Sequence, residues 1–122
     1  MENLIIEETK YTPAISLDVN GTISIVGKSY PENTFEFYAP VMEWLGTYFE
    51  EGNKKLTLNM EITYFNSSSS KLFFDMFDLL DENNSDELVI NWIYDEDNES
   101  ALEAGEDFKD DFEDLTINFV TK

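Results

Sequence analysis

Four consecutive serines, Ser67 to Ser70, are the side chains of this 122-residue chain whose position most clearly suggests chemistry. They follow Tyr64-Phe65-Asn66 and precede Lys71, between an alternating apolar run and an amphipathic run. The serines therefore fall where a strand is expected to lead into a helix. The first turn of a helix has unpaired backbone N–H groups and favours negative charge. A hydroxyl there can cap the helix, or it can carry a phosphate that the helix end tolerates.

The residues alone leave both roles of this serine run open and favour the capping role. Capping by Asn66 or Ser67 of a helix that starts around Ser69 would stabilise the fold by about 1 kcal/mol. A phosphate would instead add a charge of about −1.5 to −2 and three acceptor oxygens, and Lys71 is the only cation of the run that can pair with it. The chain has no histidine, so these serines lack the base that usually activates a catalytic hydroxyl.

Two acidic segments offer oxygen ligands. Asp95-Glu96-Asp97, with Asn98 and Glu99, has the ligand type that Mg²⁺ and Ca²⁺ prefer, but it lacks the spacing and central glycine of a calcium loop. The block at 106–114 is expected to be a solvated helix end and only secondarily a docking surface for a basic partner. We predict no cofactor and no metal site. A small metal-dependent acidic enzyme that uses Asp95 and Asp97 is kept as an alternative.

The composition excludes several function classes. Twenty-seven acidic residues against seven basic ones give a formal charge of −20, so the chain is not expected to bind nucleic acid or an anionic membrane surface. Without cysteine or histidine it has no disulfide, no thiolate nucleophile and few ligands for transition metals. No basic leader and no apolar run of membrane-spanning length is present, so we expect a cytoplasmic protein.

Apolar periodicity predicts strands that alternate with helices. Strands are expected at 14–18, 22–26, 55–65, 88–94 and 115–120, with an extra strand at 4–6 left open. Helices are expected from Asn33 to Glu51, with a regular part that starts near Pro40, at 72–80 and at 100–108, with a polar loop at 81–86. This order predicts an α/β fold: one domain over 1–122, with a mixed, mostly parallel central sheet of about five strands and three helices.

Side-chain patterns within these elements predict which residues are buried. Asn20-Gly21 predicts a tight hairpin between the first two strands. The alternation at 55–65 points Tyr64 inward with the preceding even-numbered residues, and Phe35 is assigned to the inner stripe of the first helix. The nearly continuous apolar run 88–94 predicts a central strand that is covered on both faces. The many aromatics at 35–38 leave an exposed aromatic edge for a partner as an alternative to core packing.

Three sets of residues, in family order and spread over nearly the whole chain, make it resemble the SiaC family of bacterial regulatory phosphoproteins. They are Ser29-Tyr30-Pro31-Glu32-Asn33 leading into Phe35-Glu36-Phe37-Tyr38, then Tyr64 to Lys71, then Asn91-Trp92 with Tyr94-Asp95-Glu96-Asp97. The resemblance implies a STAS-like fold, the fold of anti-anti-sigma factors. It also implies a non-catalytic protein that acts by partner switching.

The same resemblance implies the partners and the switch. A dedicated kinase would phosphorylate the chain and a PP2C-type phosphatase would reverse this, while the unphosphorylated form would bind and activate a diguanylate cyclase, raise cyclic di-GMP and promote aggregation or biofilm. By motif position the phosphorylated residue is Ser67, with Ser68 as runner-up because four hydroxyls follow the asparagine. The partner-binding residues are then Asn66, Ser67, Ser68, Ser69, Ser70 and Lys71. An anti-anti-sigma-like adaptor with a different effector is the alternative.

Overall fold

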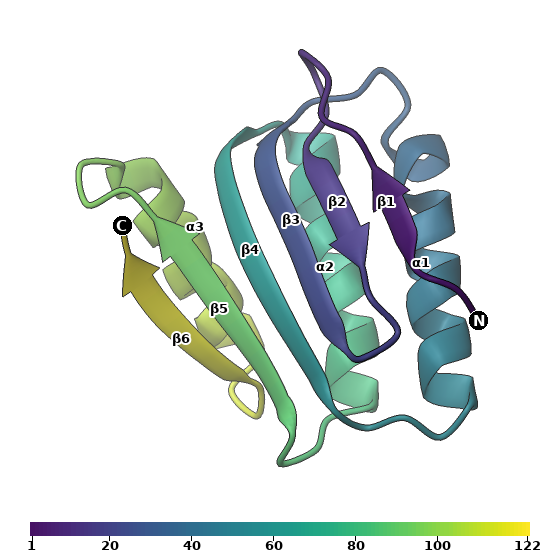
Figure 1. Ribbon diagram of the computed structural model, residues 1–122. Coiled ribbons are helices and arrows are strands. Elements are labelled where there is room, and N and C mark those ends of the chain that lie inside the picture. Colours follow the sequence, from purple (N-terminus) through teal and green to yellow (C-terminus); the bar gives the residue numbers. More distant parts are fainter.

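Nine elements form in the computed structural model, which describes residues 1–122 (Figure 1). The strands and helices are, in chain order, β1 (Leu4–Ile6), β2 (Ala14–Leu17), β3 (Thr22–Ser29), α1 (Thr34–Glu50), β4 (Leu56–Phe65), α2 (Ser67–Glu82), β5 (Leu88–Tyr94), α3 (Glu99–Asp111) and β6 (Thr116–Thr121). All three helices are too short or too polar to span a membrane.

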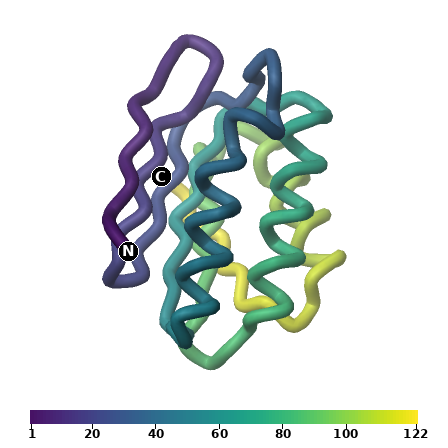
Figure 2. The backbone as a smooth tube through the Cα atoms, turned by 90° about the vertical axis from the view of Figure 1, so that its right-hand side faces the viewer, coloured from purple at the N-terminus to yellow at the C-terminus, as the bar shows by residue number.

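The strands lie in the sheet in the same order as in the chain. Strands β1, β2 and β3 pair antiparallel, and β3 to β6 pair parallel. The predicted mixed, mostly parallel sheet with three helices is confirmed, and the segment left open at the N-terminus adds a sixth strand. Each parallel connection steps in the same direction, and such connections are right-handed. All three helices therefore cover one face of the sheet, as the edge-on view shows (Figure 2).

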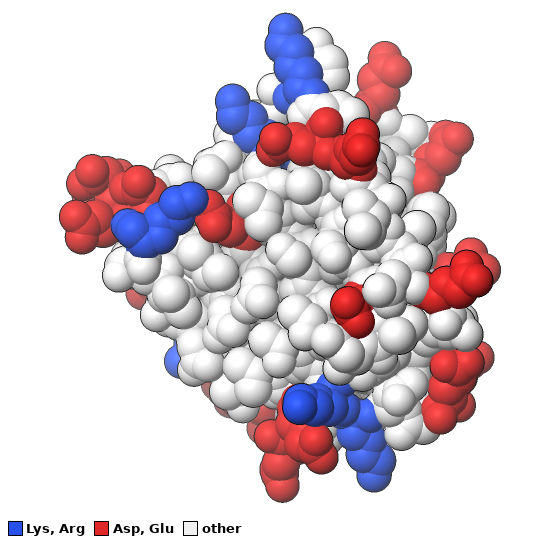
Figure 3. Space-filling model, in the orientation of Figure 1, with Lys and Arg blue, Asp and Glu red and all other residues white.

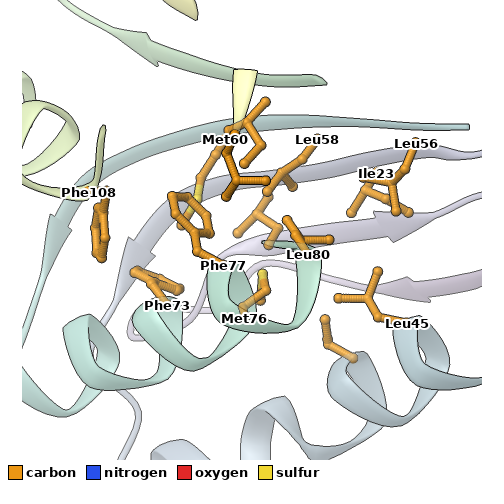
Figure 4. Packing of buried hydrophobic residues seen from close by; sticks show 14 of the residues in the cluster. Ile23, Leu45, Leu56, Leu58, Met60, Phe73, Met76, Phe77, Leu80 and Phe108 are labelled. Carbon is orange, nitrogen blue, oxygen red and sulfur yellow. The ribbon is translucent and has the colours of Figure 1, made fainter. Parts of the chain in front are cut away.

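The hydrophobic core lies between the helices and the covered face of the sheet (Figure 4). Every second residue of the strands and one stripe of each helix point into this layer, as periods of 2 and 3.6 residues require. Fully buried members include Ile23, Ile25, Leu56, Leu58, Met60, Leu88, Ile90, Trp92, Leu45, Phe73, Met76, Phe77 and Leu80. Burying this apolar surface is the main term that holds the helical layer on the sheet.

The prediction that strand 88–94 is covered on both faces is wrong. Leu88, Ile90 and Trp92 face the helices and are buried, whereas Val89, Asn91 and Ile93 are only half-buried. Because every helix crosses on the same side, no helix remains for the opposite face of β5.

The inward assignment of Tyr64 is also wrong, because β4 contains a bulge. Ile62 pairs with Gly27, but the next pair joins Tyr64 to Lys28, so Thr63 is an extra residue in β4. A bulge reverses the alternation beyond it. Phe65 therefore faces the helices, while Tyr64 lies on the helix-free face with 55% of its surface exposed.

The first helix begins at Thr34 and not near Pro40. The side chain of Asn33 accepts a hydrogen bond from the backbone N–H of Glu36 at 3.1 Å, which caps a turn well before the proline. Pro40 lies inside the helix, where it removes one N–H donor. The assignment of Phe35 to the inner stripe is wrong, since 57% of its surface is exposed.

The other two helices are longer than predicted. Helix α2 begins at Ser67 rather than around Ser69, and it takes up the first two residues of the loop expected at 81–86. Helix α3 extends past both ends of the predicted range 100–108. Each helix follows an asparagine whose side chain accepts a backbone N–H of the first turn, namely Asn33, Asn66 and Asn98.

The predicted hairpin between β2 and β3 is confirmed. Gly21 adopts a φ of 98°, which only glycine takes without strain, and its N–H donates to the carbonyl of Asp18 at 2.9 Å. An added Cβ on Gly21 would lie 2.5 Å from the carbonyl oxygen of Lys55, so this turn also needs glycine for space.

Candidate functional site at the start of α2

The four serines form the first turn of α2, directly after the carboxyl end of β4. Asn66, with an extended backbone, is the cap: its Oδ1 accepts the N–H of Ser69 at 2.9 Å, and its carbonyl accepts the N–H of Ser70 at 3.0 Å. Of the two capping candidates left open by the sequence, the structure selects Asn66. The hydroxyl of Ser67 is therefore not needed for the cap.

The serines differ sharply in exposure. Ser67 and Ser68 are exposed, Ser70 is half-buried and Ser69 is fully buried, with 0% of its surface accessible. A modifying enzyme can reach the hydroxyls of Ser67 and Ser68 in the folded protein. It cannot reach the hydroxyl of Ser69 unless the start of α2 opens.

A chain of buried hydroxyl groups anchors this turn to β3 and α1. Ser69 Oγ donates to the carbonyl oxygen of Ser29 at 2.9 Å and lies 2.8 Å from Ser29 Oγ, which in turn lies 2.5 Å from Tyr38 Oη. One proton order satisfies all three hydroxyls: Tyr38 donates to Ser29, Ser29 to Ser69, and Ser69 to the carbonyl. Burial raises the pKa of Tyr38 to about 12, with a smaller lowering by the hydrogen bond to Ser29. The phenol therefore stays protonated and can donate.

Sequence reasoning used Ser29 and Tyr38 as residues of the family resemblance and assigned no hydrogen-bonding role to either. Ser29 occupies the next inward-facing position of β3 after Ile23, Ile25 and Gly27, and it is fully buried. A polar residue at an inward position of a strand must find a hydrogen-bond partner. That alternation was the signal that could have identified Ser29, although its partners come from distant segments.

Lys71 is the cation nearest to the serines along α2. Its Nζ lies 6.0 Å from the centroid of the Phe35 ring, so it reaches across to the start of α1. Such an exposed cation–π contact contributes about 0.5–1 kcal/mol. Lys71 lies one helical turn after Ser67, on the same side of the helix, and the first turn of α2 contains no acidic residue.

An open groove runs between α2 and α3 beside the serines. Its lining residues are Phe65, Ser67, Ser70, Lys71 and Phe74 from the β4–α2 region, and Ala104, Asp107, Phe108 and Asp111 from α3. The groove combines exposed aromatic surface with one acidic wall. Ser67 belongs to its lining and Ser68 does not.

Exposed aromatic side chains flank the serine turn. Phe74 lines the groove, Phe35 contacts Lys71, and Tyr64 packs edge-on against Tyr30 at a centroid distance of 5.4 Å. Tyr30 packs in the same way against Tyr11 at 5.2 Å. The exposed aromatic surface that the sequence left as an alternative is therefore present, although at Phe35 rather than along the whole segment 35–38, since Tyr38 is buried.

The acidic residues considered for a metal site do not converge. The Oδ1 of Asp95 accepts the backbone N–H of Asp97 at 2.9 Å in the turn before α3. No group of three or more acidic side chains is arranged to hold a metal ion. The segment 106–114 lies mostly on α3 and contributes Asp107 and Asp111 to the groove wall.

Comparisons with known proteins agree with one another. The family model described as SiaC family regulatory phosphoprotein matches residues 6–122. The uncharacterized protein PA14_02130 of Pseudomonas aeruginosa (strain UCBPP-PA14) is 37% identical over 114 residues, which cover 91% of this chain and 90% of that protein. The structure of apo-SiaC from Pseudomonas aeruginosa is 33% identical, covers 99% of this chain and 100% of its own, and has a TM-score of 0.92. SiaC in the crystal structure of diguanylate cyclase SiaD with its activator SiaC, also from Pseudomonas aeruginosa, is 34% identical, covers 98% of this chain and 99% of its own, and has a TM-score of 0.91.

Proposed function

This chain belongs to the SiaC family of regulatory phosphoproteins, and we propose on that basis that it is a non-catalytic, cytoplasmic partner-switching protein. Its unphosphorylated form binds and activates a diguanylate cyclase. The observation that carries the proposal is the similarity to SiaC of Pseudomonas aeruginosa, which is described as the activator of the cyclase SiaD in a complex of the two. A cognate kinase and a PP2C-type phosphatase set the phosphorylation state.

In this proposal the phosphorylated residue is Ser67, with Ser68 as the runner-up. The exposure of both hydroxyls supports this choice, as does the burial of Ser69. Ser67 is preferred because it lines the groove between α2 and α3, where a phosphate would meet a docked partner. The docking surface then comprises Asn66, Ser67, Ser68, Ser70 and Lys71 with the exposed rings of Phe35 and Phe74. Ser69, predicted with them as a partner-binding residue, is left out because its side chain is fully buried.

The switch follows from the cost of burying a phosphate. A partner that covers the serine turn would have to remove water from a group with a charge of about −1.5 to −2, next to exposed aromatic surface. Burying such a charge without a cation costs several kcal/mol, and each 1.4 kcal/mol changes an affinity about tenfold. Lys71, one turn along α2, can pair with a phosphate on Ser67 inside the free protein, which stabilises the unbound modified form.

The first test is peptide mass spectrometry on the protein isolated from its native cells, with and without phosphatase treatment. We expect one phosphate on the peptide that contains Ser67 to Ser70, located on Ser67. Ser67→Ala and Ser67→Asp are then used to capture partners from the same cells, and the captured fractions are assayed for cyclic di-GMP synthesis. We expect cyclase activity with Ser67→Ala and little with Ser67→Asp.

Ser100→Asp is the matched control, because Ser100 is an exposed serine in the first turn of α3, which also follows an asparagine cap. It should capture the cyclase as the wild type does. The proposal fails if the serine peptide stays unmodified under all growth conditions, or if Ser67→Asp captures as much cyclase activity as Ser67→Ala.

A further inference from the structure

The face of the sheet opposite the helices has no covering layer, which is unusual for parallel strands. Sheets of parallel strands are normally buried on both faces, and their strands are then apolar at every position. Apart from Asn91, strand β5 has such a sequence, Leu-Val-Ile-Asn-Trp-Ile-Tyr, yet Val89 and Ile93 lie on the face of the sheet that no helix covers. Another surface is therefore expected to cover this face.

Few strand residues of the same face are charged. Its strand residues, taken from the alternation and the pairing register, are Ile5, Ala14, Ser16, Thr22, Ser24, Val26, Lys28, Thr57, Asn59, Glu61, Tyr64, Val89, Asn91, Ile93, Thr116, Asn118 and Val120. Of these strand residues only Lys28 and Glu61 are charged, and Glu61 forms an ion pair with Lys122. Glu8 and Lys10, from the segment between β1 and β2, line a hollow with Val26, Lys28 and Glu61 at one edge of the face. Figure 3 looks onto this face and shows the charged side chains mainly along its outline, with few in the middle.

The polar groups in the middle of the face already have partners within it. Asn91 Nδ2 donates to Asn59 Oδ1 at 2.9 Å, and Asn118 Nδ2 donates to Asn91 Oδ1 at 3.3 Å, so one row of amides crosses three strands. A covering layer would therefore bury amides that keep hydrogen bonds to each other. This lowers the desolvation cost that usually opposes the covering of a polar surface.

We propose that a second copy of this chain covers the helix-free face, sheet on sheet, about 10 Å apart. The charge distribution favours a second copy of this chain over a basic partner. Two copies, each with a formal charge of −20, repel each other wherever acidic residues face each other, and the strands of this face carry a single acidic residue, Glu61, which is paired with Lys122. A basic partner would gain more at the acidic helical layer. Val26 and Val120, exposed at 36% and 40%, lie on this face and would come into the contact.

The test is the mass of the purified chain by sedimentation velocity over a wide range of concentration. We expect a species of twice 14.2 kDa. Its dissociation constant should fall when salt is raised from about 0.1 M to about 1 M, because the Debye length drops from about 10 Å to about 3 Å and the acidic rims repel less. Val26→Asp and Val120→Asp each place new like charges on the covered face and should weaken the dimer roughly tenfold or more.

Thr47→Asp is the control, since it adds the same charge at an exposed position of α1 in the helical layer. It should leave the dimer within about twofold of the wild type once the general repulsion is screened at high salt. Circular dichroism of each variant establishes that it is folded. A wild-type chain that stays at 14.2 kDa at every concentration in both salts overturns the proposal, and so does equal weakening by Thr47→Asp. Neither result bears on the serine switch, which rests on a different surface.

Discussion

Replacing Ser69 with alanine should destabilise the fold by about 1–3 kcal/mol, although the change removes a single oxygen. The hydroxyl of Ser69 accepts from Ser29 Oγ and donates to the Ser29 carbonyl oxygen, and both contacts are fully buried. Without it, the hydroxyl of Ser29 becomes a buried donor with no acceptor. The Ser29 carbonyl keeps the hydrogen bond from the backbone N–H of Asn66 at 3.1 Å, so the substitution leaves only one unpaired group.

The three linked hydroxyl groups also predict that the losses of unfolding free energy caused by single substitutions do not add up. The combined variant Ser29→Ala, Ser69→Ala and Tyr38→Phe removes all three of these buried hydroxyl groups. The carbonyl oxygen of Ser29 keeps its hydrogen bond from the backbone N–H of Asn66. Because no buried donor is then left unpaired, the cost of the combined variant should be clearly smaller than the sum of the three single costs.

Urea unfolding followed by tryptophan fluorescence measures the free energy of unfolding of each variant. The signal reports unfolding because Trp44 and Trp92 are both buried in the folded state. With a slope of about 1–3 kcal/mol per molar urea, a loss of about 2 kcal/mol moves the midpoint by roughly 1 M. Ser70→Ala, at the half-buried neighbouring position, should shift it much less. A Ser69→Ala variant within about 0.5 kcal/mol of the wild type, or a triple variant as costly as the sum, would refute the reasoning.

Two further predictions concern packing and pH. Gly105→Ala should destabilise the fold by about 1–3 kcal/mol, because its Cβ would lie 2.6 Å from the buried Trp92 ring. In contrast, the Cβ of Gly46→Ala in α1 meets nothing within 4 Å, so this variant should be more stable by up to about 1 kcal/mol. Thermal unfolding compares the two variants, and a stabilising Gly105→Ala would contradict the packing. The raised pKa of Tyr38 means that the unfolded chain loses this proton first. Its contribution of roughly 2–3 kcal/mol is complete below pH 10.0 and is lost as the pH rises to about 12. Urea midpoints at several pH values should therefore fall more in the wild type than in Tyr38→Phe, which keeps Tyr48, whose pKa burial also raises. Equal falls in the two proteins would refute the assignment.

Local signals in the sequence were sufficient to predict the kinds and order of the elements from β2 onward, while the strand at 4–6 was left open. An asparagine before each amphipathic run marks the start of a helix, and the alternation at 55–65 marks a strand up to its bulge. The junction of these two patterns placed the serines at the start of α2. Caps and periodicities act between residues a few positions apart, which is why sequence alone could reveal them.

Contacts between distant segments decided the rest. Which serine is buried depends on Ser29 and Tyr38, 40 and 31 positions before Ser69. The direction of Tyr64 depends on the bulge at Thr63, which has no partner residue on β3. The uncovered face of the sheet follows from the order of the strands. Periodicity shows which residues of an element share a face, but only the packed tertiary structure determines what lies on that face.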